Sequence, residues 1–414
     1  MTKPEEIRTS SFDYSLPDER IARYPVSPRD SSRLLVYNQG LITQDRFTGI
    51  REWLTNHNRL IFNNTRVIQA RMLFKKTTGA GIEIFCLEPF DPPDYVQAFE
   101  QTSSCQWTCL VGNARKWRSE LLEQTLMIGS KKVRLQAEKC SSTGRNYIVR
   151  FQWDNTCITF AEILDHFGST PIPPYLKREP ESSDATSYQT IYAEMNGSVA
   201  APTAGLHFTE SLLGQLEKQG VSFSHITLHV GAGTFIPVKS ENAVHHTMHA
   251  EMVSVSRDLL STLIREEKNL ITVGTTSTRS LETLYWLGVK SLVNPEFTLR
   301  NLFFDQWEAY NLPPDVPVKE AISSLLHRID EAGMNQLDYT TQIMIVPGYR
   351  FKLTEGLITN FHQPRSTLLM LIAAFVGNDW KRIYQVALDQ NFRFLSYGDS
   401  SILLPSGSHS QFPI

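Results

Sequence analysis

The sequence lacks the features of disulfide-rich, membrane-spanning and secreted proteins. It has five cysteines in 414 residues and no Cys-x-x-Cys pair, which indicates a reduced protein with incidental thiols. No run approaches the roughly 18 apolar residues of a membrane span, and the most apolar stretch, residues 368–376, has the length of a buried helix. Residues 1–10 carry four charges with no apolar run behind them, so we expect no secretory signal and a cytoplasmic protein.

A strong excess of one charge is also missing. Lys and Arg number 40 and Asp and Glu number 43, which gives a formal net charge of −3. This balance excludes a protein that holds nucleic acid by bulk positive charge, but it permits a local basic patch. Hydrophobic residues make up 41% and charged residues 20%, as in ordinary globular proteins. There is no internal repeat, and the length predicts two cores with a cleft between them.

Residues 66–159 have the pattern of a small all-β domain. Short runs of alternating apolar and polar residues are separated by Gly and Asn turns, which is typical of a closed β-barrel. All five cysteines lie in this segment, as expected if they serve as small core residues. The clearest predicted strands cover residues 82–87, 107–111, 132–135 and 147–151.

Beyond residue 160, predicted helices and strands alternate, which favours a largely parallel sheet. Gly220 and Gly288 are interpreted as helix stops. The predicted helices cover residues 160–166, 211–219, 257–268, 280–287 and 367–375, and the predicted strands cover residues 221–230, 270–273 and 343–346. We therefore predict an α/β sandwich domain formed by residues 1–65 and 160–414, with a β-barrel domain of residues 66–159 inserted into it.

Residues 289–338 are interpreted as an extra helical arm of the sandwich domain. Several prolines precede a stretch in which apolar residues recur at helical spacing. Packing on the sheet explains such a face best, while partner binding and substrate contact are alternatives. The apolar positions of this helix are Ile322, Leu325, Leu326 and Ile329.

Two segments of the sequence are rich in small residues. Residues 197–208 contain one histidine, His207, and small residues let a ligand approach the backbone closely. A tightly packed turn around a core histidine explains this loop equally well. Residues 227–235 run from a strand into a Gly-x-Gly at Gly231 and Gly233. Ligands favour strand ends in α/β sheets, but without a third glycine or a helix start the dinucleotide fingerprint is not met.

Residues 273–282 pass from a strand through a hydroxyl-rich turn into a helix. Free N–H groups at a helix start bind anions, and Arg279 could clamp a carboxylate or a phosphate. A simple Ser or Thr cap would explain one of the hydroxyls but not all four. Residues 357–364 and 393–399 also place polar groups after strands or turns, either for ligand contact or for structure alone.

A metal site must be weighed, because six of the eleven histidines fall within residues 207–249. His225 and His229 would lie about 13 Å apart on one strand, too far to share an ion. Neither a His-Glu-x-x-His pattern nor a cysteine completes a zinc set around residues 245–249. We therefore expect no metal, and we favour general acid–base chemistry with Glu251 nearby.

Two basic clusters lie in the predicted β domain. Residues 115–118 surround Trp117 with Arg and Lys, and residues 131–134 contain three further basic side chains. Contact with RNA phosphates plus stacking on the aromatic ring is one use of such clusters. A solvated, charged rim is an equally good interpretation.

Taken in order along the chain, these segments resemble the S-adenosylmethionine:tRNA ribosyltransferase-isomerases of queuosine biosynthesis. The resemblance covers most of the chain, and a dozen ordered matches are far more specific than any short motif. Further matching segments are residues 12–17, residues 29–35, Phe62-Asn63-Asn64-Thr65-Arg66-Val67, Pro171-Ile172-Pro173-Pro174-Tyr175 and residues 188–192.

The resemblance implies a transferase that uses S-adenosylmethionine as a ribosyl donor. The ribosyl group is transferred to 7-aminomethyl-7-deazaguanine in the tRNA anticodon and isomerised to an epoxide, which leaves epoxyqueuosine in the tRNA and releases adenine and methionine. A β-barrel beside an α/β sandwich, tRNA as a partner, no metal and a cytoplasmic location are also implied, and we expect a monomer. The chemistry needs a base for the acidified 5′ carbon, a proton or hydrogen bond for the departing adenine, and a neutral tRNA amine.

The matching positions supply candidate residues without assigning each a role. Arg66 and Arg279 are candidates for holding the methionyl carboxylate or a tRNA phosphate. The candidates for proton transfer are His207, His229, His249, Glu251, His362 and Asp399. The candidates for substrate binding are Arg66, Thr203, Gly205, Gly231, Gly233, Thr234, Thr276, Ser277, Arg279, Asn360 and Tyr397.

Three features depart from the family pattern. Gln69 replaces a usual proline, Ser400-Ser401 differs from the usual pair, and the arm at residues 289–338 is longer than the family norm. These departures bear on the tRNA contacts more than on the donor chemistry. The alternatives are a non-catalytic relative that binds tRNA or a nucleotide, a metal-dependent hydrolase, and a conventional methyltransferase, whose glycine-rich turn with an acidic ribose ligand we do not find.

Overall fold

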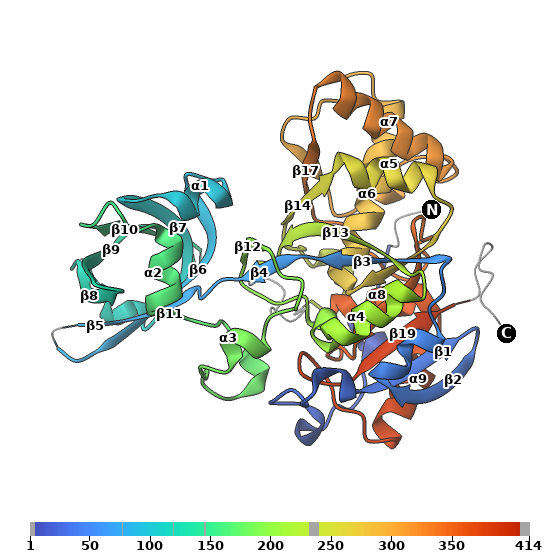
Figure 1. Cartoon of the computed structure of the whole chain (residues 1–414), viewed down its shortest axis with the longest axis horizontal. Coiled ribbons are helices and arrows are strands. Elements are labelled where there is room, and N and C mark those ends of the chain that lie inside the picture. Colours follow the sequence, from blue (N-terminus) through green and yellow to red (C-terminus); the bar gives the residue numbers. More distant parts are fainter. Residues whose placement is uncertain (1–4, 77, 119, 145, 232–239, 406–414) are drawn as a thin grey trace.

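The computed structural model describes residues 5–76, 78–118, 120–144, 146–231 and 240–405, and two sheets organise this part of the chain (Figure 1). The larger sheet has ten strands in the spatial order β16-β17-β14-β13-β3-β15-β18-β19-β1-β2. In that order the strands are Leu302–Phe304, Gln336–Thr341, Glu251–Ser256, Ser222–His229, Asn58–Asn63, Asn269–Val273, Thr354–Asn360, Ser400–Leu404, Arg33–Asn38 and Leu41–Arg46.

The prediction of a largely parallel sheet holds for the centre of this sheet, whereas the sheet as a whole is mixed. Strands β13, β3, β15 and β18 are parallel neighbours, and β3 is buried along its whole length, as expected for a strand covered on both faces. Antiparallel pairs flank this centre. One of them follows from local geometry, since Gln39 and Gly40 between β1 and β2 have φ of 49° and 90°, which makes a tight hairpin turn.

The helices around the larger sheet mostly lie where the periodicity predicts them. Gly220, just after α4, has a φ of 90° and ends that helix as predicted. The helices are α4 (Glu210–Lys218), α5 (Arg257–Arg265), α6 (Thr275–Val293), α7 (Val318–Glu331), α8 (Thr367–Val376) and α9 (Asp379–Asp389).

Two of the predicted elements are wrong. Helix α6 continues through Gly288, where the sequence suggested a stop, because the glycine serves close packing: a Cβ there would lie 2.4 Å from the carbonyl oxygen of Ala321 on α7. Residues 343–346 form no strand. They form a buried irregular segment. Its backbone bonds to a side chain and not to a neighbouring strand, since the Ile343 carbonyl accepts a hydrogen bond from Arg279 Nε at 3.1 Å.

The smaller sheet is antiparallel and has seven strands in the order β11-β5-β6-β7-β10-β9-β8. In that order they are Gly168–Ser169, Arg71–Lys75, Gly81–Asp91, Ser104–Gly112, Asn146–Trp153, Lys131–Thr143 and Leu122–Ile128. The sheet curls so that β5 and β8 come into contact, but no hydrogen-bonded ladder joins these two strands in the described residues. It is therefore a curled half-barrel, in which the predicted complete closure is not seen.

Helix α2 (Phe160–Phe167) belongs to the core of the smaller sheet. Its buried residues Phe160, Ile163 and Leu164 pack in the same cluster as the strand residues, so this core extends beyond residue 159. Three of the five free cysteines are buried in it, namely Cys86, Cys105 and Cys109, while Cys140 and Cys157 are exposed. Trp117 is also buried, and its indole Nε1 donates to the Glu120 carbonyl at 2.8 Å, so it cannot stack on RNA as the sequence suggested.

A short junction joins the two sheets. Strand β4 (Thr65–Val67) pairs in parallel with β12 (Met195–Ser198), and Figure 1 shows this pair between the two larger sheets. Helix α1 (Tyr95–Glu100) of the smaller sheet faces the end of β13, and a short helix α3 (Asp184–Ser187) follows in the connecting segment. The ring of Tyr95 stacks on His229 with a centroid distance of 4.4 Å and an interplanar angle of 10°.

The segment 289–338 is an extension of the larger sheet. It contributes β16 and part of β17 to one edge, and α7 packs against α5 and α6. Ile322, Leu325 and Ile329 are buried as predicted, which supports a packing role for this helix. In the described part of the chain, no helix is both long and apolar enough to cross a bilayer.

Candidate active site

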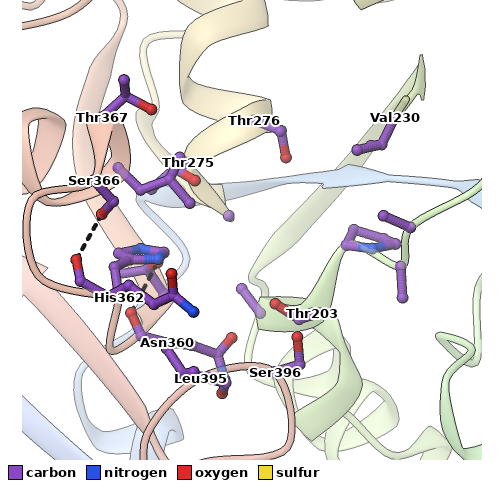
Figure 2. Close-up of a pocket in the computed structure, with 18 of the residues that line it drawn as sticks. Thr203, Val230, Thr275, Thr276, Asn360, His362, Ser366, Thr367, Leu395 and Ser396 are labelled. Atoms are coloured by element: carbon purple, nitrogen blue, oxygen red, sulfur yellow. Dashed lines mark hydrogen bonds between the residues drawn. The ribbon is translucent and has the colours of Figure 1, made fainter. Parts of the chain in front are cut away.

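A pocket lies where several central strands of the larger sheet end (Figure 2). The turn after β15, the segment after β18 and the loop after β12 all reach it, which is the position where ligands bind in open α/β sheets. It encloses about 1170 Å³ of space, part of it open to solvent. The lining comprises residues 200–204, 274–276, 359–363, 366–368 and 395–396 together with Tyr175, Tyr188, Val230, His246, His249 and Arg279.

The N-terminus of α6 opens into this pocket. Gly274 precedes the helix with a φ of 96°, and none of the described side chains caps the first turn. Thr275 and Thr276 line the pocket, whereas Ser277 points back and donates to the Val273 carbonyl at 2.9 Å. The free N–H groups and the helix dipole make this end suited to an anion.

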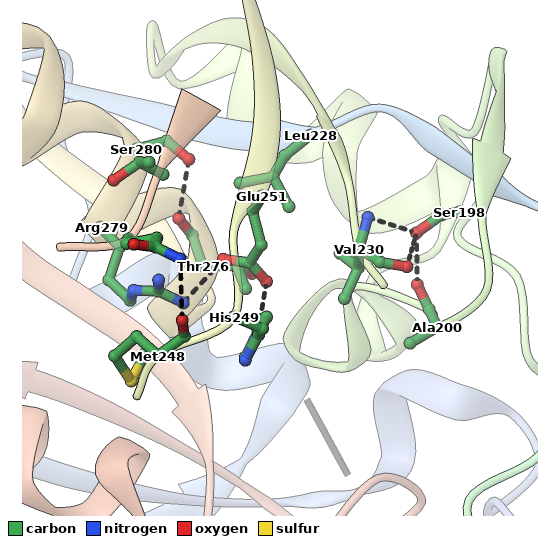
Figure 3. A network of polar contacts seen from close by, with 12 residues as sticks. Ser198, Ala200, Leu228, Val230, Met248, His249, Glu251, Thr276, Arg279 and Ser280 are labelled. Atoms are coloured by element: carbon green, nitrogen blue, oxygen red, sulfur yellow. Dashed lines mark hydrogen bonds and ion pairs between the residues drawn. The ribbon is translucent and has the colours of Figure 1, made fainter. Parts of the chain in front are cut away.

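A buried charged network stands beside that helix end (Figure 3). Arg279 is 2% exposed, and its Nη1 lies 2.6 Å from Glu251 Oε2. The other oxygen, Oε1, lies 3.1 Å from His249 Nε2. The second guanidinium nitrogen, Nη2, is buried and has no hydrogen-bond partner among the described residues. An additional anion could therefore pair with Arg279 from the pocket.

The protonation of Glu251 follows from its neighbours. Burial alone would raise the pKa of this carboxyl group, but the positive charge of Arg279 and the interactions with His249 outweigh burial and hold its pKa below the ordinary value. Glu251 is therefore a carboxylate at neutral pH. His249 lines the pocket. The Glu251 carboxylate fixes the orientation of the His249 ring, as carboxylates commonly do for histidine bases.

His362 also lines the pocket, but in a drier environment. Its Nε2 lies 2.9 Å from Thr359 Oγ1, and its backbone N–H donates to the Tyr384 hydroxyl at 3.0 Å. Burial lowers the pKa of His362 to about 4. The ring is therefore neutral at pH 7, and it can exchange hydrogen bonds with a ligand without carrying a charge.

His207 lies behind the pocket wall, at the end of the 3-10 turn Thr203–His207. Its Nδ1 is 2.8 Å from Ser32 Oγ, and its Nε2 is 3.1 Å from Nδ2 of Asn360. Burial lowers the pKa of His207 to about 3. Asn360 and Thr203 reach the pocket, whereas the His207 ring does not line it.

Other predicted residues lie outside the pocket lining. Asp399 accepts hydrogen bonds from the backbone N–H groups of Arg33 and Arg393 at 3.0 and 2.8 Å, so it joins the start of β1 to the turn at residues 393–399. Tyr397 donates to Asp184 at 2.8 Å. His229 packs on Tyr95, and burial lowers its pKa.

The predicted glycines and Arg66 have different surroundings. Gly205 lies against the Tyr192 hydroxyl, where a Cβ would approach to 1.8 Å. Among the described residues, no atom beyond the chain neighbours of Gly231 would lie within 4 Å of a Cβ there. Arg66 is exposed on β4. Gly233 and Thr234 lie outside the described residues. The structure thus brings together Thr203, Thr276, Arg279, Asn360, His249 and His362 in one lining, with Glu251 and His207 directly behind it.

Sequence reasoning missed several residues of the lining. Ser366 and Thr367 stand at the start of α8, and Ser366 caps that helix by accepting from the Leu369 N–H at 3.2 Å. This is the same hydroxyl-before-helix signal that identified residues 275–278. Tyr175 and Ser396 are hydrogen-bonded to each other on the pocket wall, and no local pattern pairs residues so far apart in the sequence. In the described ranges, no group of three His, Cys, Asp or Glu side chains could hold a metal ion.

Comparison with known proteins decides the family. A family model described as a queuosine biosynthesis protein matches residues 9–403. This chain belongs to that family. The queuosine biosynthesis family includes curated relatives from Sulfurihydrogenibium sp. (strain YO3AOP1) and Francisella philomiragia, both named S-adenosylmethionine:tRNA ribosyltransferase-isomerase. Both are 35% identical to this chain, the first over 405 residues and the second over 403. In both cases the match covers 96% of this chain and 100% of the relative.

A solved structure is also similar. It is an S-adenosylmethionine tRNA ribosyltransferase from Thermotoga maritima, 27% identical in sequence, and the match covers 95% of this chain and 99% of that chain with a TM-score of 0.44. The family resemblance predicted from the sequence is confirmed by the family model and the curated relatives.

Proposed function

We propose that this protein transfers and isomerises the ribosyl group of S-adenosylmethionine onto 7-aminomethyl-7-deazaguanine in tRNA, giving epoxyqueuosine-tRNA and releasing adenine and methionine. The observation that carries this proposal is the similarity to relatives of that name along 96% of this chain and their whole length. The enzyme is an S-adenosylmethionine-dependent transferase, and we infer that it acts in the cytoplasm as a monomer and without a metal.

The anion-binding corner of the pocket fits the methionyl carboxylate of the donor. Arg279 offers a buried guanidinium nitrogen without a partner among the described residues, and the uncapped start of α6 offers backbone N–H groups next to it. A charged hydrogen bond from a buried arginine is stronger than a neutral one. We infer that these two features bind the carboxylate and so orient the sulfonium toward the rest of the pocket.

His249 is the best-placed group to remove the proton from the 5′ carbon. It lines the pocket, and the Glu251 carboxylate holds its ring by the 3.1 Å contact at Nε2. A carboxylate at this position stabilises the imidazolium that forms when the histidine accepts a proton. His362, kept neutral by burial, is suited to hydrogen-bond the departing adenine.

An adenine-release assay with His249→Gln tests this proposal. With S-adenosylmethionine and tRNA carrying the aminomethyl base, we expect the wild type to release adenine and methionine, and the variant to lose about 100-fold or more in kcat, because positioned bases contribute 10²–10⁴-fold. Binding of S-adenosylmethionine should change little.

The matched control is His327→Gln, since His327 makes a similar contact with a glutamate, 3.3 Å from Glu331, but at an exposed site on α7. This control should keep wild-type activity. Folded wild-type protein that binds tRNA and S-adenosylmethionine without releasing adenine would reject the proposal in favour of a non-catalytic binding protein. Equal losses in both variants would reject His249 as the base.

A further inference from the structure

A chain of three buried polar side chains runs from the protein interior to the pocket wall. It consists of Ser32, His207 and Asn360, which are 1%, 4% and 3% exposed. The Ser32 hydroxyl lies 2.8 Å from His207 Nδ1, and His207 Nε2 lies 3.1 Å from Asn360 Nδ2. Only Asn360 reaches the pocket (Figure 2).

The orientation of the Asn360 amide is determined by its neighbours. Its Nδ2 lies 3.2 Å from the Leu395 carbonyl oxygen. A backbone carbonyl can only accept a hydrogen bond, so the amide atom facing it must be the nitrogen. The second hydrogen of the same nitrogen points to His207. Both donors of the Asn360 side chain are therefore used inside the protein.

The state of His207 follows from this arrangement. Because its Nε2 accepts from Asn360, the ring proton must sit on Nδ1, from which it is donated to the Ser32 hydroxyl. Burial of the ring favours the same neutral form, since it lowers the pKa of His207 to about 3. Phe47 packs on the ring with a centroid distance of 5.0 Å. His207 is thus a fixed acceptor, enclosed by protein.

The remaining polar atom of the Asn360 side chain is its oxygen, Oδ1. Oδ1 is buried and has no partner among the described residues, and an unsatisfied buried acceptor is unfavourable. A ligand in the pocket that brings an N–H or O–H group to this atom would remove that penalty. The side chain cannot offer a donor instead, because the Leu395 carbonyl and His207 hold the amide in one orientation.

We propose that Ser32 and His207 are positioning residues, which hold Asn360 so that its Oδ1 accepts a hydrogen bond from the bound ribosyl donor. This inference rests on the proposed function and names one polar contact of that pocket. S-adenosylmethionine carries three groups with the required chemistry, namely its ribose hydroxyls, its adenine amine and its α-ammonium group. His207 acts through Asn360 and does not itself exchange a proton with the substrate.

The binding test compares wild type with Asn360→Leu, His207→Leu, His207→Gln and the double variant His207→Leu/Asn360→Leu. For Asn360→Leu we expect the Kd for S-adenosylmethionine to rise about five- to tenfold, the worth of one hydrogen bond. His207→Leu should raise it less, and the double variant should match Asn360→Leu, because the two residues act as one unit. His207→Gln should recover part of the loss, since its amide oxygen can replace Nε2 as the acceptor.

The assay of kcat separates positioning from proton transfer. If His207 is a positioning residue, kcat of His207→Gln should stay within severalfold of the wild-type value. If His207 were a catalytic base, kcat should fall about 100-fold or more in both His207 variants. Losses that add in the double variant, or a 100-fold fall in kcat for His207→Gln, would overturn the proposal. If His207→Leu does not fold, Ser32→Ala with and without Asn360→Leu supports or overturns it by the same additivity test.

Nitrogen-15 NMR of the histidines gives a direct readout. We expect His207 to show a protonated Nδ1 and an unprotonated Nε2 from pH 8 down to pH 5. In Asn360→Asp the carboxylate should draw a proton onto Nε2. A wild-type His207 that carries its proton on Nε2 or titrates near pH 6.5 would contradict the assigned hydrogen bonds.

Three donor analogues, which lack both ribose hydroxyls, the adenine amine or the α-ammonium group, identify the contacted group. The analogue without the contacted group should bind wild type and Asn360→Leu equally well, and the other two should still distinguish them. Three analogues that all retain the full difference would overturn the contact. If the wild type turns over normally and Asn360→Leu binds S-adenosylmethionine as tightly as the wild type, this inference alone is rejected. If the wild type releases no adenine, the proposed function is rejected.

Discussion

Single buried histidines make the stability of this protein sensitive to mild acid. Burial lowers the pKa of His207 to about 3 and that of His362 to about 4, against an ordinary value of about 6.5. Below pH 6.5 the unfolded chain binds protons at these positions and the folded chain does not. Stability must therefore fall as the pH decreases from about 6.5 to 4.

The expected slope can be measured with His362→Gln. Each such histidine contributes up to about 1.4 kcal/mol per pH unit in this window, so the plot of unfolding free energy against pH should be shallower by about that amount in the variant. Urea denaturation at half-unit steps from pH 7 to 4 provides the data. Glu251 does not affect the comparison, because its lowered carboxyl pKa costs stability only from about pH 5 downward and does so equally in both proteins. Parallel plots for the two proteins would show that His362 titrates normally in the fold.

Some of the residues that the sequence predicted for the pocket line it, and others do not. Thr276, Arg279 and Asn360 were predicted because strands end beside them, and they line the pocket. Asp399 and Tyr397 were predicted because they lie beside a glycine turn, yet their polar groups bond to the backbone and to Asp184. A strand end fixes where the backbone is. The direction of the side chain depends on partners far away in the sequence, which local spacing does not contain.

Glycine has two different structural roles in the helices of this chain. Gly220 ends α4 with a positive φ, as a left-handed residue after a helix should. Gly288 is an ordinary helical residue in α6 that lets α7 approach. Composition and periodicity look alike at the two positions, so the first was predicted correctly and the second was not. The difference is a contact with Ala321, 33 residues further along the chain.

We expect Gly288→Ala to destabilise the protein. Alanine favours a helix over glycine by about 1 kcal/mol, but here its Cβ would lie 2.4 Å from the Ala321 carbonyl oxygen, and overpacking of this kind costs about 1–3 kcal/mol. Gly214 in α4 is the matched control, because a Cβ there meets nothing within 4 Å. Thermal denaturation should give a lower Tm for Gly288→Ala and a raised or unchanged Tm for Gly214→Ala. A gain in both would mean that α6 and α7 can separate slightly at no cost.

The two sheets meet near the pocket. The chain leaves the larger sheet after β3 and returns to it at β13, and the strands of the smaller sheet lie between these two points in the sequence. Contacts at the junction therefore place the smaller sheet relative to the pocket. One of them is the stack of Tyr95 on His229. Gly197, with a φ of 144°, permits this contact, since a Cβ there would lie 2.3 Å from His229 Nδ1. Val230, next to His229, lines the pocket.

This stack should matter for the large substrate more than for the small one. A tRNA that inserts one base into the pocket extends beyond it and would meet both sheets, whereas S-adenosylmethionine needs only the pocket. Aromatic pairs contribute about 0.5–1.5 kcal/mol beyond burial, so Tyr95→Leu should lower kcat/KM for tRNA about three- to tenfold and leave the Kd for S-adenosylmethionine within about twofold. Tyr95→Phe keeps the ring and should behave as wild type. If Tyr95→Leu weakens S-adenosylmethionine binding as much as tRNA turnover, the stack supports the pocket itself and not the placement of the smaller sheet.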